Sequence, residues 1–120
     1  MNASWLSERL IMLLWALGAV ERLPAAIEQC DAAVFRGLLP PFAPISVSGF
    51  VAAARLRPDA ELIAMADATL SLHWEARHAR LNGSTPRIPV DMEVIQERHH
   101  AINWVIGYDG LPWDEVTTDT

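Results

Sequence analysis

Two long segments of helical periodicity, each with its own start and stop signals, constrain the fold of this chain most strongly. The first starts at Pro58, with acidic residues in the following turn, and ends at Asn82-Gly83. Proline in the first turn and acidic side chains near the positive end of the helix dipole are typical of a helix start. The second starts at Asp91, a good capping residue, and runs to about Ile106, before Gly107. No stretch alternates with period two for long enough to predict a strand, so the sequence predicts an all-α fold.

The N-terminal part also predicts a helix, starting at Trp5 with Ser4 as its cap and ended by Leu23-Pro24. The uncharged stretch 10–20 is apolar on almost every face, so we expect this helix to be buried on all sides. It is too short for a membrane span, which needs about 20 residues. Glu8 and Arg9 cancel in charge, so the basic leader of a secretory signal is missing.

Proline and glycine break the chain between Pro24 and Pro44. We expect one or two short helices there, one of them capped by Asp31, and then an irregular crossing. Ser46 or Ser48 then starts another short helix through Phe50 to Leu56. The prediction is a single compact bundle of about five helices, two or three of them long.

At 120 residues the chain is long enough for one hydrophobic core, and we expect a single domain over residues 1–120. Its helical body spans 1–107 and its irregular tail 108–120. The tail holds four acids and no base, which leaves a net charge of -2 on residues 1–108 out of -6 in all. Leu111, Trp113 and Val116 would be exposed in a free tail, so we expect the tail to fold back on the helices.

The charge composition excludes several functions. All nine basic residues are arginine, so lysine Schiff-base chemistry and a P-loop lysine are absent. Acids outnumber bases, which argues against a nucleic-acid or anionic-membrane partner. The single Cys30 cannot form an internal disulfide and is expected to be a small buried side chain. We expect a cytoplasmic protein, and nothing in the sequence implies a cofactor.

A helical wheel of residues 58–82 separates a polar face from a broad apolar arc. The polar face holds Asp67, Ser71, Glu75, His78 and Asn82. Three basic side chains, those of His73, Arg77 and Arg80, fall inside the apolar arc and are therefore expected to point inward. The apolar members of that arc are Leu62, Ile63, Met65, Ala66, Leu70, Leu72, Trp74, Ala76 and Leu81.

The same construction for residues 92–106 places Arg98 in the middle of a core stripe and His99 at its edge. Trp104 points the other way, so it needs a covering partner, which could be the tail, a second subunit or a missing segment. The stripe itself consists of Val94, Ile95, Ala101, Ile102, Val105 and Ile106.

Charged side chains in a core stripe need acids or an anionic ligand. The nearest acids in the sequence are Glu97 and the tail residues Asp114 and Asp119. Two interpretations follow: an internal arginine–carboxylate network, which we favour, or a pocket that binds an anion. The candidate residues for either are His73, Arg77, Arg80, Glu97, Arg98, His99, Asn103, Asp114 and Asp119.

Metal and nucleophile patterns are weak. His99 and His100 are adjacent and point about 100° apart on a helix, and no His-x-x-x-His pair occurs. A zinc site would need the fold to bring His73, His99 and carboxylates together, so we expect no metal. Neither a Gly-x-Ser-x-Gly turn nor a local Cys-His pair is present, and we name no catalytic residue.

Several of these residues lie in segments that resemble a known family. The segments are 97–104 (ERHHAINW), 113–120 (WDEVTTDT), 54–58 (ARLRP) and 72–83 (LHWEARHARLNG). Together they resemble a bacterial family of uncharacterised proteins, the domain of unknown function numbered 4272. Members are often longer at the N-terminus, so the chain resembles a short member or the C-terminal portion of one. The resemblance implies no activity, substrate or cofactor.

We therefore expect a non-enzymatic protein-interaction or binding module with a buried arginine, histidine and acid network. Trp104 and Trp113 are the candidate interface residues, for a partner protein or for a second copy of the chain. The alternative is a small anion- or ligand-binding enzyme that uses His73, Arg77, Arg98 and the tail acids.

Overall fold

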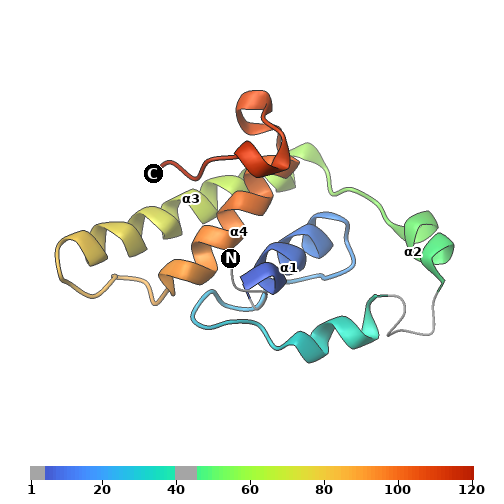
Figure 1. Ribbon diagram of the computed structural model, residues 1–120, viewed down its shortest axis with the longest axis horizontal. Coiled ribbons are helices and arrows are strands. Elements are labelled where there is room, and N and C mark those ends of the chain that lie inside the picture. Colours follow the sequence, from blue (N-terminus) through green and yellow to red (C-terminus); the bar gives the residue numbers. More distant parts are fainter. Residues whose placement is uncertain (1–4, 40–45) are drawn as a thin grey trace.

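The computed structural model of the chain describes residues 5–39 and 46–120, and over these it is helical without a strand. The fold class is therefore all-α, as predicted (Figure 1). The elements, in chain order, are α1 (Leu6–Ala16), the 3-10 helix η2 (Ala32–Gly37), α2 (Val47–Ala53), α3 (Asp59–Leu81), α4 (Met92–Val105), and the short 3-10 helices η3 (Tyr108–Gly110) and η4 (Trp113–Glu115).

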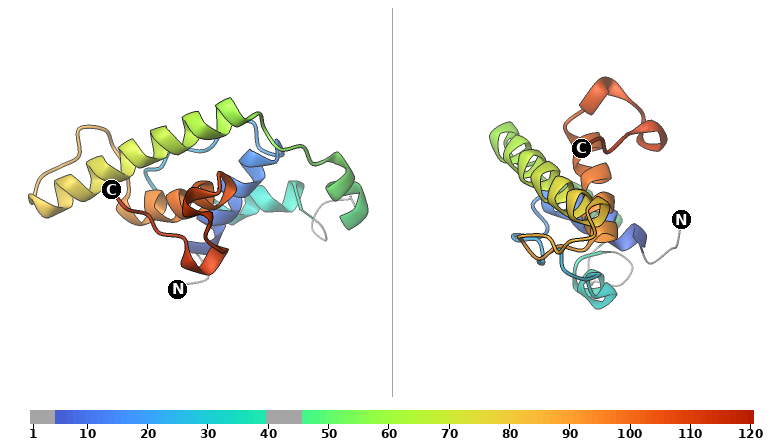
Figure 2. Two further views of the ribbon diagram at one scale, coloured as in Figure 1. Left: turned by 90° about the horizontal axis from the view of Figure 1, so that it is seen from above. Right: turned by 90° about the vertical axis from the view of Figure 1, so that its left-hand side faces the viewer.

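α4 is the helix on which the other two long elements assemble, since both α1 and α3 pack against it (Figures 1 and 2). The main core lies where these three helices meet, and a second cluster of Ile11, Leu14 and Phe35 lies between α1 and η2. The buried members of the main core are Met12, Trp15, Ala16, Leu62, Ala66, Ala101 and Ile102.

Most of the predicted helix ends are confirmed. The side chains of Asp31, Ser46 and Asp91 each accept a hydrogen bond from a backbone N–H two or three residues later, at 2.9 to 3.0 Å. α3 begins directly after Pro58 and α4 ends before Gly107, whose φ of 73° is left-handed. The local signals thus place the two helices that carry most of the candidate site.

The prediction that the first helix runs to Leu23-Pro24 is wrong, because α1 ends at Ala16. Gly18 adopts a φ of +77°, which turns the chain out of the helix. The expected Ser4 cap lies outside the described residues. Arg57 donates to the carbonyl of Trp15 in the last turn of α1 and to that of Val20 beyond it, and its guanidinium lies over the Trp15 ring.

The prediction that Arg77 and Arg80 point inward is also wrong, since both are exposed. α3 packs mainly against α4, and it buries a single narrow face. That face consists of Leu62, Ala66, Thr69, His73, Ala76 and Ala79. The opposite side of the predicted arc is exposed, and it includes Ile63, Leu70, Trp74 and Leu81.

The tail does fold back on the helices, as predicted. Val116 is buried, and the Asn103 side chain donates a hydrogen bond to the Thr117 carbonyl at 3.0 Å. Figure 1 shows the end of the tail passing over α3 and α4. Among the described residues, no helix is both long and apolar enough to cross a membrane.

Candidate functional site

The candidate residues separate into two buried polar centres and a set of surface residues. His73, His99 and Asn103 lie under the tail, between α3 and α4. Arg98 lies on the other side of α4, against α1. Arg77, Arg80, Asp114 and Asp119 are exposed. The fold therefore does not assemble one common site.

The centre under the tail is a pair of histidines. The Nδ1 atoms of His73 and His99 are 2.8 Å apart, and each side chain is only 2% exposed. The rings meet edge to face, with centroids 5.1 Å apart. At this distance one ring donates its Nδ1–H to the unprotonated Nδ1 of the other, so the contact requires at least one neutral imidazole.

Burial and nearby charge keep this pair neutral. Burial, with a smaller contribution from the neighbouring His73, lowers the pKa of His99 to about 4, while Asp119 acts in the opposite direction. Burial lowers the pKa of His73 as well, and the Arg77 guanidinium adds to that effect. Two neutral rings joined by one hydrogen bond form a structural contact between α3 and α4 at neutral pH.

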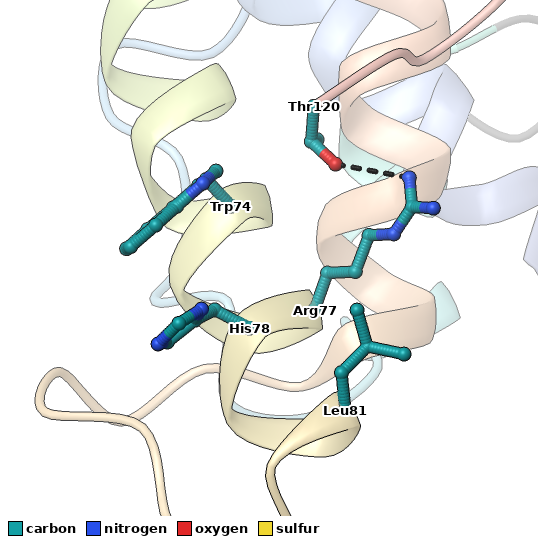
Figure 3. A pocket seen from close by; sticks show the side chains of 5 residues that line it. All are labelled: Trp74, Arg77, His78, Leu81 and Thr120. Atoms are coloured by element: carbon teal, nitrogen blue, oxygen red, sulfur yellow. Dashed lines mark hydrogen bonds between the residues drawn. The ribbon is translucent and has the colours of Figure 1, made fainter.

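The end of the tail borders this pair at the surface. Arg77 donates to the hydroxyl of Thr120 at 3.1 Å, and the Thr117 hydroxyl donates to the Asp119 carboxylate at 3.1 Å. Figure 3 shows Arg77 reaching Thr120, while the Trp74 and His78 rings lie stacked on the other side of the same small hollow. The hollow has a volume of 170 Å³.

The second centre is an ion pair between Arg98 of α4 and Glu8 of α1. Arg98 Nε donates to Glu8 at 3.1 Å, and Arg98 also donates to the Pro24 carbonyl at 2.6 Å. The two side chains are 3% and 0% exposed. Glu8 accepts a further hydrogen bond from the Cys30 N–H at 2.6 Å. Arg98 is thus paired inside the protein, with Glu8 in place of the tail acids that the sequence predicts.

Glu8 is the residue that the sequence interpretation missed. The helical wheels of residues 58–82 and 92–106 do not include Glu8, which lies one turn before Ile11 and Met12, both fully buried. A wheel of α1 would have placed this acid on the core face. Cys30, beside it, is half-buried, and burial together with Glu8 raises the pKa of its thiol.

The remaining charged candidates pair near the surface of the molecule. Glu97 accepts from Arg9, and Arg80 donates to Glu93 at 3.0 Å. Arg9 also lies over the Trp113 ring, which contacts the rings of His100 and Trp104 edge to face. Trp113 therefore holds the tail against α4 and covers part of Trp104.

The rest of Trp104 borders an apolar groove of 450 Å³. Trp104 remains 44% exposed, and Leu56, which also lines the groove, is 58% exposed. The groove forms because the N–H groups of Arg55 and Arg57 donate to the carbonyls of Leu17 and Ala16. Leu56, which lies between these two arginines in the sequence, is therefore held beside the end of α1. The lining residues are Leu13, Ala16, Leu17, Leu56, Trp104 and Val105.

Residues 1–116 match the model of a single protein family, described as Domain of unknown function (DUF4272). The chain belongs to this family. No curated protein and no solved structure matches the chain.

The polar centres and the groove of this DUF4272 chain differ in their access to solvent. Within residues 5–39 and 46–120, no three His, Cys, Asp or Glu side chains come together as a set that could hold a metal ion. The His73–His99 pair is buried, and the Arg98 guanidinium is paired with Glu8, although its buried Nη2 has no hydrogen-bond partner among the described residues. By contrast, the groove beside Trp104 is open and apolar, and its lining residues carry no titratable group.

Proposed function

We propose that this protein is a non-enzymatic protein-interaction module whose groove beside Trp104 accepts an apolar side chain of a partner protein. The observation that carries the proposal is the open apolar groove of 450 Å³ with a large aromatic side chain at its rim. This volume lies within the range of about 300–1,000 Å³ typical of binding pockets. Tryptophan is enriched at the centres of protein interfaces, where a large apolar ring is covered on binding.

The alternative, a small anion-binding enzyme, has less support. It needs a free guanidinium beside the histidines, and Arg98 instead lies against Glu8 on another side of α4. Arg77 is close to the histidine pair, but both rings are buried and hydrogen-bonded to each other. The arrangement favours a structural role for the polar residues and a binding role for the apolar groove.

The test uses a photo-crosslinking amino acid at Leu56, on the wall of the groove, in the native host. Ile27 is 55% exposed and does not line the groove, so the same amino acid at that position is the matched control. We expect a discrete adduct from position 56 that is absent from position 27. The adduct identifies the partner, which is then purified for binding measurements.

Binding of the purified partner should weaken more than about tenfold in Leu56→Glu, because a charge in an apolar interface loses its hydration. Ile27→Glu should bind as tightly as the native protein. Equal affinity of both variants, or identical adducts from both positions, would show that the groove is not the binding surface.

A further inference from the structure

A polar pocket lies between the last turns of α3 and the loop that follows this helix. It has a volume of 390 Å³. This volume is near the lower end of the range of about 300–1,000 Å³ typical of ligand pockets, so the pocket fits a small molecule. Its walls are Trp74, Glu75, His78 and Ala79 of α3 and the loop segment 84–87. None of these residues lines the groove beside Trp104.

Hydrogen bonds hold the loop against α3 at both ends of the pocket. The chain turns back at Gly83, whose φ is 63° or less from the left-handed minimum at 61°, and the Ser84 N–H then donates to the Ala79 carbonyl at 2.8 Å. At the other end, the Arg87 guanidinium donates to Glu75, from Nε at 3.2 Å and also from Nη2. The walls of the pocket are therefore in place before a ligand binds, which lowers the entropic cost of binding.

The Glu75–Arg87 pair supplies both an acceptor and a donor without adding net charge. Both guanidinium N–H groups go to Oε1 of Glu75, and neither Glu75 Oε2 nor Arg87 Nη1 has a side-chain partner in the part of the chain that the structure describes. The Arg87 guanidinium lowers the pKa of Glu75, so the carboxylate is ionised at neutral pH. Because the charges of the pair cancel, the pocket favours a neutral ligand over an ion.

An aromatic wall completes the pocket. The Trp74 and His78 rings are stacked, with centroids 4.6 Å apart and 9° between their planes, as Figure 3 shows from the side of the neighbouring hollow. The stacking fixes the orientation of the indole, while Trp74 remains 45% exposed. An exposed indole held in one orientation offers a rigid apolar surface to the C–H groups of a saturated ring.

We propose that this pocket binds a neutral sugar in its pyranose form, with the ring against Trp74 and two adjacent hydroxyls bonded to Glu75 and Arg87. A hydroxyl can both donate and accept, so one hydroxyl donates to the Glu75 carboxylate while its neighbour accepts from the Arg87 guanidinium. Hydrogen bonds to charged groups of this kind are stronger than those between neutral groups. Ser84 and Thr85 also line the pocket, and their hydroxyls are available to the rest of the sugar ring. The site is independent of the groove proposed to bind a partner protein.

The test follows the indole N–H signals of the ¹⁵N-labelled full chain by NMR. The probes are the methyl glycosides of glucose, galactose, mannose and N-acetylglucosamine, each titrated to about 50 mM, since a single sugar ring binds with a dissociation constant on the order of a few millimolar. At least one glycoside should shift the Trp74 signal to saturation and leave the Trp104 signal in place. The best of them should bind several-fold more weakly as a deoxy analogue that lacks one of the two adjacent hydroxyls, because a charged partner then loses its hydrogen bond.

Two pairs of variants place the sugar in the pocket. Trp74→Ala should weaken binding more than about tenfold, whereas Leu70→Ala should not, since Leu70 is 40% exposed on the same helix outside the pocket. Glu75→Gln should weaken binding several-fold, and Glu61→Gln is its control, because Glu61 pairs with Arg57 away from the pocket. Circular dichroism shows that each variant is folded.

Three results would overturn the proposal. The first is a Trp74 signal that none of the four glycosides shifts. The second is equal affinity of Trp74→Ala and Leu70→Ala, or an equal shift of the Trp104 signal, either of which would mean that sugars bind exposed rings without selection. The third is a shift of the Trp74 signal by inorganic phosphate as large as that by any glycoside, which would assign the pocket to an anion. Loss of partner binding at the groove would leave all these measurements unchanged.

Discussion

His73 and His99 show how burial turns two ordinary residues into a contact that depends on pH. Their shared hydrogen bond at 2.8 Å needs an unprotonated acceptor, and burial lowers the pKa of both rings. Arg77 disfavours a charge on His73, and Asp119 only partly offsets the effect of burial on His99. Protonation of both rings would leave two Nδ1–H groups facing each other.

The free energy of unfolding should therefore fall as the pH falls from about 6.5 toward about 4. In that window the unfolded chain binds a proton on His99 and the folded chain does not, and the lowered pKa of His73 acts in the same direction, so acid favours unfolding. Each histidine contributes at most about 1.4 kcal/mol per pH unit. Urea unfolding at pH 7.0, 5.5 and 4.5 measures the slope.

Two variants identify the source of that slope. The double variant His73→Leu/His99→Leu removes the titrating pair and should show a shallower pH dependence than the native protein. His78→Gln removes an exposed histidine of α3 and should keep the native slope. A double variant with the native slope would mean that other groups cause the acid sensitivity.

The contacts between elements differ in how far the sequence predicted them. Helix ends depend on the residues beside them, so Pro58, Asp91 and Gly107 could be interpreted from the sequence alone. The partner of Arg98 depends on which helix packs on α4, and that information lies 90 residues away at Glu8. The exposure of Arg77 depends likewise on how many helices cover α3. Local signals predicted elements, and tertiary packing decided the site.

The Glu8–Arg98 pair joins α1 to α4, so its loss should destabilise the whole domain. Arg98→Met leaves the buried Glu8 carboxylate without its counter-charge, and breaking a buried ion pair costs about 3–5 kcal/mol. Thermal and urea unfolding, followed by circular dichroism, measure this change. Arg98→Met with an unchanged melting temperature would show that the pair is not formed.

A double substitution separates the charge effect from the packing effect. Glu8→Leu/Arg98→Met removes both charges and should recover a large part of the lost stability. Recovery should stay incomplete, because the Cys30 N–H and the Pro24 carbonyl each lose a buried partner. Asp119→Asn is the control from the tail, since its carboxylate bonds Thr117 rather than an arginine.

Across the whole molecule, stability should follow the position of each helix relative to α4. α4 is packed by α1 on one side and by α3 on another, and it contains a run of buried residues from Arg98 to Asn103. α2 has no buried residue and lies at the periphery (Figure 1). Helices with few buried contacts open locally, whereas a central helix opens only when the domain unfolds.

Amide hydrogen exchange followed by NMR should therefore be slowest in α4 and fastest, among the α-helices, in α2. We expect a difference of at least about 100-fold, which corresponds to about 2.7 kcal/mol between local and global opening. Exchange rates that rise tenfold per pH unit between pH 6.5 and 7.5 would establish that they report opening equilibria. Arg98→Met serves as the matched comparison, because it should accelerate exchange in α4 by the loss of global stability and leave α2 unchanged. Equal protection of α2 and α4 would instead mean that the peripheral helix unfolds only with the core.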